Sequence, residues 1–221
     1  MPVNKEAYQI LQNELAENKV NLVAVSKTKP VADILELYNL GQRDFGENYV
    51  QEMVKKAGQL PKDIRWHYIG HLQTNKVKLI APFVHLIHGV DSLKLLEEIN
   101  KQGGKYGRVI ECLLQVHIAE EETKFGLSET ELNELIIRYR NLPMNNVRLA
   151  GLMGMASFTD DMNKVRKEFQ NLKGIFDKLA AKDSRLPTLS MGMSSDYKIA
   201  MEEGSNMVRV GTLLFGERTT A

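Results

Sequence analysis

Short apolar, β-rich runs alternate along the chain with longer segments of helical periodicity. The short runs cover residues 22–25, 44–46, 66–69, 84–88, 109–116, 147–152, 188–191 and 207–210. The helical segments cover residues 31–40, 49–57, 74–80, 93–100, 129–140, 163–181 and 196–203, and one more helix is expected from about Asn4. Runs of this length rich in β-branched residues predict strands, and apolar residues three or four positions apart predict helices.

Regular alternation of strand and helix predicts parallel strands joined by crossover helices. Eight such units can close into a (β/α)8 TIM barrel, and 221 residues lie near the lower end of the size range of that fold. The rival is an open doubly wound sheet, which usually has a glycine-rich loop after its first strand. Here that loop carries Lys27 and Lys29 instead. No linker rich in Pro, Gly or Ser divides the chain, so we expect a single α/β barrel domain over residues 1–221.

The composition excludes several classes of protein. With 43% hydrophobic and 26% charged residues the chain is typical of globular proteins, and its formal charge of +1 lacks the positive field of a nucleic-acid binder. Cys112 is the single cysteine, so no intrachain disulfide can form. No signal-peptide core and no run of about 18 apolar residues is present. We therefore expect a cytoplasmic protein that binds neither membranes nor nucleic acid.

Small and polar residues follow the last two predicted strands. Ser194 follows the seventh strand, and Gly211 and Thr212 follow the eighth. In parallel barrels the loops after the strands build the site, and phosphate typically binds near the last two of these loops. Glycines and hydroxyl residues mark ordinary turns in most proteins, but their pairing in both loops favours a phosphorylated ligand.

Lys27 ends the first strand with the same parity as Val23 and Val25, which predicts that its stem points into the barrel. Burial lowers the pKa of a lysine there and leaves an amine that can condense with an aldehyde. Most lysines are instead solvated or ion-paired. Lys29 shares the parity but precedes Pro30, which is typical of a first helical residue. Lys27 is therefore the better candidate, and a phosphate-bearing aldehyde is the predicted ligand.

Two further residues leave alternatives open. Arg209 stands between Val208 and Val210 in the eighth strand, so it is either paired with an acidic residue or serves a ligand. Asn48 follows the second strand and could orient a ring hydroxyl, although capping of the next helix is the commoner role.

The histidines do not predict a metal site. His67 and His71 are four residues apart, but on a strand they would not converge as they do on a helix. His85 and His88 have opposite parity and should lie on opposite faces of their strand. We therefore expect no metal.

Seven segments match the motifs of a known family in order and cover nearly the whole chain. They are residues 24–30 (AVSKTKP), 45–52 (FGENYVQE), 66–76 (WHYIGHLQTNK), 91–92 (DS), 151–153 (GLM), 189–194 (LSMGMS) and 208–218 (VRVGTLLFGER). In these segments the chain resembles the pyridoxal phosphate (PLP) homeostasis proteins, the YggS/PROSC family.

The resemblance implies the barrel of the N-terminal domain of alanine racemase, which is PLP fold type III. It implies that Lys27 carries PLP as a Schiff base, that Arg209 faces the pyridine nitrogen and that Asn48 lies near the ring. The phosphate would be held by Ser194, Gly211 and Thr212. An arginine at the ring nitrogen keeps that nitrogen unprotonated, which weakens the ring as an electron sink. No catalytic residue is expected.

The resemblance implies a non-enzymatic, monomeric protein of vitamin B6 homeostasis that stores or delivers PLP, with PLP-dependent apoenzymes as recipients. The alternative is a compact amino-acid racemase with Lys27 and a residue such as Tyr49 or His67 as its two bases. A third hypothesis is a Schiff-base aldolase acting on sugar phosphates. Racemases of this class add a C-terminal β domain that helps to supply the second acid/base residue, whereas this chain ends at Ala221, soon after its eighth unit. We therefore expect poor turnover.

Overall fold

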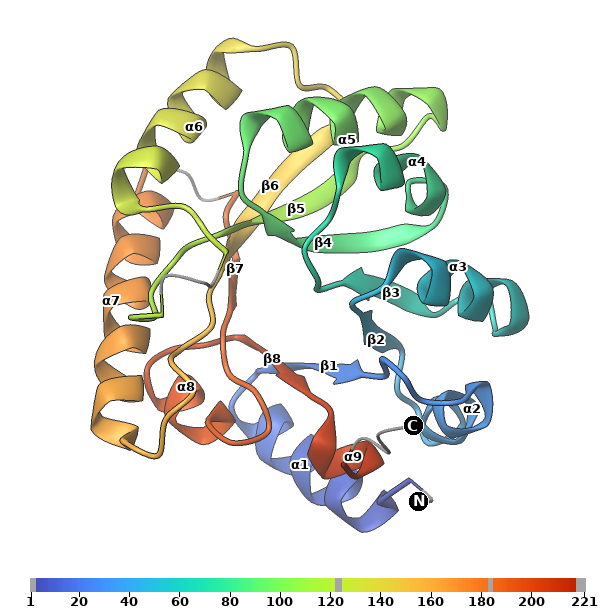
Figure 1. The fold of residues 1–221 in the computed structure, drawn as a ribbon. Coiled ribbons are helices and arrows are strands. Elements are labelled where there is room, and N and C mark those ends of the chain that lie inside the picture. The colour runs from blue at the N-terminus through green and yellow to red at the C-terminus, as the bar shows by residue number, and fades with distance from the viewer. Residues whose placement is uncertain (1–2, 122–124, 183–184, 218–221) are drawn as a thin grey trace.

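The computed structural model describes residues 3–121, 125–182 and 185–217, and its strands close into a parallel barrel (Figure 1). Neighbours in the barrel are neighbours in the sequence, and the first strand pairs with the eighth. The strands are β1 (Asn21–Val25), β2 (Asp44–Glu47), β3 (Arg65–Tyr68), β4 (Val84–Val90), β5 (Ile110–Gln115), β6 (Val147–Met153), β7 (Thr188–Ser190) and β8 (Met207–Val210). The predicted TIM barrel is confirmed, and the open doubly wound sheet is excluded.

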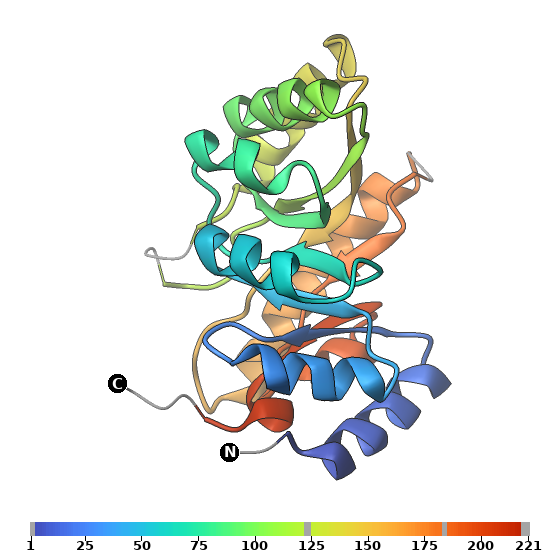
Figure 2. The same ribbon diagram turned by 90° about the vertical axis from the view of Figure 1, so that its right-hand side faces the viewer.

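Helix α1 precedes the first strand, the other helices follow the strands, and together they surround the barrel (Figures 1 and 2). They are α1 (Lys5–Glu17), α2 (Val31–Asn39), α3 (Val50–Gln59), the 3-10 turn η1 (Thr74–Lys76), α4 (Val77–Ile80), α5 (Leu93–Lys105), α6 (Glu129–Asn141), α7 (Met162–Ala180), α8 (Tyr197–Glu202) and α9 (Thr212–Phe215). Asn4 N donates to Leu214 O at 2.9 Å, so the first and last helices lie side by side. None of the helices in the described ranges is long and apolar enough to cross a membrane.

Two apolar layers hold the barrel together. A small cluster fills part of its interior, and a much larger one lies between the outer face of the strands and the helices. The inner cluster consists of Val23, Leu86, Leu113, Ala150, Met153 and Met207. Leu22 and Ala24 of β1 belong to the outer layer, because successive side chains of a strand point to opposite faces.

Helix boundaries follow local capping signals in some places and tertiary packing in others. The predicted start near Asn4 is confirmed, since its side chain accepts from Ala7 N at 3.0 Å. The expected helix over residues 74–80 is divided between η1 and α4. Helix α5 continues five residues beyond its predicted end at residue 100, to Lys105. It passes Gly103, where an added Cβ would lie 2.6 Å from Asn146 O, so a larger side chain is excluded from this contact.

Candidate functional site

Lys27 lies two residues beyond the end of β1, at the C-terminal end of the barrel, and is partly buried. Val23, two positions before the last strand residue, packs in the inner cluster, as the predicted parity requires. The next residue, Thr28, has φ 64°, a left-handed conformation that is unfavourable for a β-branched side chain. The turn that carries Lys27 must therefore be held by its surroundings.

A buried polar group, which we call the Lys56 network, holds this turn. It consists of Lys56, Glu47, Glu52 and Ser26. Lys56 Nζ donates to Ser26 O at 2.7 Å, to Glu47 Oε1 at 2.8 Å and to Glu52 Oε1 at 2.7 Å. Ser26 Oγ donates to Glu47 Oε1 at 2.6 Å, and Thr28 N donates to Glu52 Oε1 at 2.6 Å. The backbone on both sides of Lys27 is thereby tied to β2 and α3.

Electrostatics within this network are set by burial. The Glu47 side chain is fully buried, and desolvation raises the pKa of its carboxyl although Lys56 and Ser26 act in the opposite direction. The sequence reasoning did not find Lys56. It could have been noticed from its position in the helix, because Lys56 lies on the same buried face of α3 as Val50 and Met53.

The amine of Lys29 is engaged elsewhere. Its Nζ donates to the carbonyls of Phe215, Gly216 and Glu217 at 2.8, 3.1 and 3.0 Å. These carbonyls lie at the C-terminal end of α9 and just beyond it, where helix carbonyls lack partners within the helix. Lys29 therefore joins the first loop of the barrel to the last helix.

The two loops predicted to bind phosphate lie against each other. Gly211 N donates to Ser194 Oγ at 3.2 Å, which joins the loop after β7 to the loop after β8. Thr212 is the exposed first residue of α9. Gly192, the second residue of the loop after β7, has φ 99°, and an added Cβ would lie 2.6 Å from Ala200 Cβ. Only glycine fits this position without strain.

Arg209 of β8 is buried, with 4% of its surface exposed. Its Nη1 donates to Ser190 O at 3.0 Å and to Ser190 Oγ at 2.6 Å, and its Nη2 donates to Gly154 O at 3.0 Å. Burial lowers the pKa of Arg209 to about 10, and the charge of Asp196 acts in the opposite direction. A guanidinium carries more N–H donors than these contacts use, so donors remain for a ligand.

Asn48 does not cap the following helix. Tyr49 occupies the N-cap position of α3 and no side chain makes a capping hydrogen bond there, so the commoner alternative considered for Asn48 is wrong. Asn48 Oδ1 is buried and has no hydrogen-bond partner among the described residues. A buried acceptor of this kind is costly unless a ligand supplies a donor. This atom therefore fits a ligand hydroxyl.

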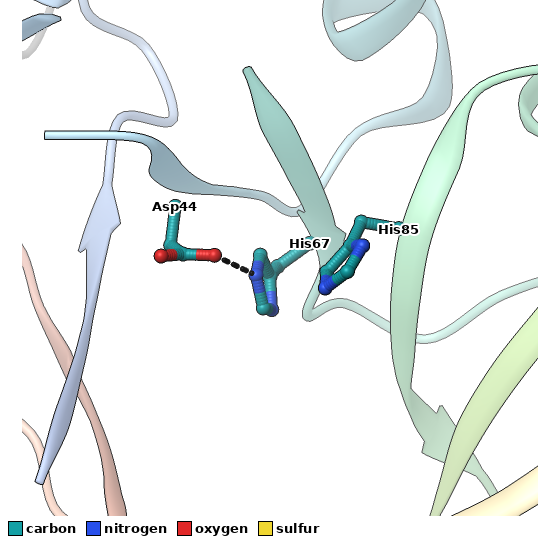
Figure 3. A group of neighbouring side chains, drawn as sticks. All are labelled: Asp44, His67 and His85. Carbon is teal, nitrogen blue, oxygen red and sulfur yellow. Dashed lines mark hydrogen bonds and ion pairs between the residues drawn. The ribbon is translucent and has the colours of Figure 1, made fainter. Parts of the chain in front are cut away.

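Asp44, His67 and His85 lie together (Figure 3), and Asp44 and His85 are among the first residues of β2 and β4, at the end of the barrel opposite Lys27. Their candidate ligand atoms lie within 4.8 Å of one another, a set of types that could hold a metal ion. However, Asp44 Oδ1 is 2.9 Å from His67 Nε2, and Arg65 Nε donates to the same oxygen at 2.7 Å. Asp44 and His67 are therefore already hydrogen-bonded to each other, and Asp44 is also paired with Arg65.

The parity argument for the histidines was wrong in one respect. The rings of both His85 and His88 lie near that of His67, with centroids 5.3 and 5.2 Å apart. The register between β3 and β4 shifts between Trp66 and His67, so simple alternation along β4 does not hold there. His71 lies apart from this group and stacks on Phe125.

Comparison with known proteins identifies the family. The model of the alanine racemase N-terminal domain matches residues 5–219. The pyridoxal phosphate homeostasis protein of Aquifex aeolicus is 44% identical over 204 residues, which cover 91% of this chain and 89% of the relative. The chain belongs to the pyridoxal phosphate homeostasis protein family. The resemblance inferred from the seven segments is thus confirmed.

Solved structures agree with this family. PipY of Synechococcus elongatus, solved with PLP bound, is 35% identical, with a TM-score of 0.86 over 96% of this chain and 99% of PipY. An alanine racemase of Clostridium difficile is 16% identical, with a TM-score of 0.73 over 99% of this chain and 58% of the racemase. The second likeness shows only the fold, and it confirms the expected racemase-like barrel.

Proposed function

We propose that this protein binds PLP and serves in intracellular PLP homeostasis without catalytic turnover. The observation that carries the proposal is the convergence at one end of the barrel of Lys27, Asn48 and the joined loops of Ser194 and Gly211. The family supports it, because the relative from Aquifex aeolicus is named for PLP homeostasis and PipY was solved with PLP bound.

The residues present fit each part of PLP. Lys27 is the amine we assign to covalent attachment, and Asn48 Oδ1 offers its unused acceptor to the ring hydroxyl. Arg209 can only donate, so a ring nitrogen that it binds must be unprotonated. Ser194, Gly211 and Thr212 would hold the phosphate. PLP, when bound, supplies an electrophilic aldehyde on an aromatic ring, and an unprotonated ring is a weak electron sink.

Neither candidate for the second base of a racemase, His67 or Tyr49, is supported by its position. His67 is hydrogen-bonded to Asp44, the first residue of β2, and so lies toward the end of the barrel opposite the loops. Tyr49 is half exposed and stands at the N-cap position of α3. A second positioned acid/base group is what racemization requires. We therefore propose that the protein is not an enzyme.

We also propose that residues 1–221 form one PLP-binding domain, which is a cytoplasmic monomer that passes PLP to apoenzymes. Cys112, the single cysteine, is buried in β5, which suits a reducing compartment. Transfer is tested by mixing the loaded protein with a PLP-dependent apoenzyme and following recovery of its activity. Light scattering of the loaded protein tests the monomer.

The attachment site is tested by borohydride reduction of the PLP-loaded protein followed by peptide mass mapping. We expect the pyridoxyl adduct on Lys27. Lys27→Ala should lose the adduct and the yellow absorption band while keeping weaker, phosphate-mediated binding. The matched control is Lys29→Ala, which should still be labelled on Lys27. An undiminished band in Lys27→Ala would move the site elsewhere.

Turnover is tested separately by incubating the PLP-loaded protein with single L-amino acids. We expect no D-isomer at enzymatic rates. Its formation at such rates, together with loss in Lys27→Ala, would establish the racemase alternative. A protein that remains colourless with PLP but is labelled by a sugar-phosphate aldehyde would support the aldolase.

A further inference from the structure

A continuous line of hydrogen bonds crosses the barrel interior from Arg209 to Asp44. Arg209 Nη1 donates to Ser190 Oγ at 2.6 Å, and Ser190 Oγ lies 3.3 Å from His88 Nδ1. His88 Nε2 lies 2.9 Å from His67 Nδ1, and His67 Nε2 lies 2.9 Å from Asp44 Oδ1. We call Ser190, His88, His67 and Asp44 the polar chain. It links strands β7, β4, β3 and β2 to the arginine of β8.

Two of the four bonds have a fixed direction, because Arg209 can only donate and the Asp44 carboxylate can only accept. Ser190 Oγ therefore accepts from Arg209, and its own proton finds an acceptor if Ser190 donates to His88 Nδ1. His88 must then carry its proton on Nε2 and donate to His67 Nδ1. By the same reasoning His67 carries its proton on Nε2 and donates to Asp44. Assigned in this way, both imidazoles are neutral, in the same tautomer, and each donates toward the carboxylate.

The electrostatics are consistent with a neutral His88 between a cation and an anion. Although burial acts to raise it, hydrogen bonds from Arg65 and His67 hold the pKa of the Asp44 carboxyl well below its usual range. His88 is fully buried, and desolvation lowers its pKa well below the usual value. A cation at one end and an anion at the other align the dipoles of the bonds between them, which strengthens each bond.

If the two hydrogen bonds made by His88 ran in the reverse direction, the Ser190 hydroxyl proton would be left without an acceptor among the residues that the structure describes. If His67 were protonated on both nitrogens, His88 would accept at Nε2 and donate from Nδ1 to Ser190 Oγ. That oxygen would then accept from both His88 and Arg209, and its own proton would have no acceptor within the described part of the chain. A buried hydroxyl in this state loses a hydrogen bond.

We propose that the polar chain positions Arg209, so that its guanidinium is held still toward the ligand side of the barrel. The proposal rests on the proposed function only for the identity of that ligand, the ring of PLP. Ser190, His88 and His67 are positioning residues in this scheme, because they act through Arg209. Removing one link should loosen the guanidinium without removing its charge.

The first test needs no cofactor. In the protein labelled with ¹⁵N-histidine, long-range ¹H–¹⁵N spectra at neutral pH should show His67 and His88 as neutral Nε2–H tautomers. Replacements His67→Gln and His88→Gln assign the signals. His71, which is not a member of the polar chain, serves as an internal reference. An Nδ1–H tautomer at His88 or an imidazolium at His67 would overturn the proposal.

The second test compares two buried serines. Ser190→Ala removes a link of the polar chain, whereas Ser205→Ala removes a hydroxyl that contacts the backbone of Leu189, Met191 and Met207. In Ser190→Ala, we expect the Nη–H signals of Arg209, resolved in the wild type, to merge as the guanidinium begins to rotate. Ser205→Ala should leave them resolved. Identical Arg209 signals in wild type and Ser190→Ala would refute the positioning role.

Binding provides the third readout. We expect Ser190→Ala to bind PLP about tenfold more weakly, the effect of one hydrogen bond to a charged group. The absorption maximum of bound PLP should also shift, and Ser205→Ala should change neither. If both variants bind PLP as the wild type does, the polar chain has no role in binding and the proposal fails. If the wild type itself does not bind PLP, the proposed function fails, while the Arg209 signals still decide the positioning role.

Discussion

Replacement of Lys56 by methionine probes how strongly the turn at Lys27 is held. The Lys56 and Glu47 side chains are 5% and 0% exposed, and their charged atoms are 2.8 Å apart. Methionine fills most of the volume of lysine but leaves the Glu47 carboxylate buried, with Ser26 Oγ as its remaining donor in this network. Removing one partner of a buried ion pair typically destabilises a protein by about 3–5 kcal/mol. We expect Lys56→Met to lose stability by that amount at neutral pH.

The loss should depend on pH in a defined direction. Burial already raises the pKa of Glu47 above its usual 4.5, and the positive charge of Lys56 opposes that rise. Without the lysine, the pKa in the folded state rises further. A carboxyl whose pKa is raised on folding binds its proton more tightly in the folded state. Stability therefore falls as the pH rises from the pKa of the unfolded state to the higher pKa of the folded state. The deficit of Lys56→Met should therefore shrink as the pH falls toward 4.5.

Urea unfolding followed by circular dichroism, at about pH 7.5 and about pH 5, measures this difference. The matched control is Lys101→Met, because Lys101 is 64% exposed and lies 3.6 Å from Glu98. An exposed pair of this kind should contribute less than about 1 kcal/mol. The double variant Lys56→Met/Glu47→Gln should recover much of the loss. A deficit below about 1 kcal/mol for Lys56→Met at neutral pH, or one equal at both pH values, would refute the reasoning.

Three further predictions follow from packing. Gly192→Ala should destabilise the protein by about 1–3 kcal/mol, because φ is 99° and the new methyl would meet Ala200 Cβ; unchanged thermal unfolding would contradict this. Gly174→Ala, in the middle of α7 with open space at the Cβ position, should stabilise it by about 1 kcal/mol in the same assay, and a lower melting temperature would count against that account. Cys112 is fully buried, and burial raises the pKa of its thiol. A thiol reagent should therefore modify the unfolded protein but not the folded one, which mass spectrometry measures. Rapid labelling of Cys112 under native conditions would contradict this prediction.

Local patterns determined the order of the strands and helices, and hence the barrel. Strand parity placed Val23 inside it, and the cap at Asn4 set the start of the first helix, because such signals depend on residues close together in the sequence. Helix α9, which is a single turn, was not predicted, because four residues carry no detectable period. The assignments of Lys27 and the phosphate loops remain predictions that the labelling experiment tests.

Only the tertiary structure decided which polar groups meet. The pairing of Lys56 with Glu47 could not be predicted from the sequence, because the packing of α3 against β2 sets that contact. The line from Arg209 to Asp44 joins residues up to 165 positions apart (209 − 44), and a register shift beside His67 helps to bring its members together. Periodicity reports which face of an element is buried. Which buried polar atoms face each other depends on the closure and register of the barrel, and these are properties of the folded chain.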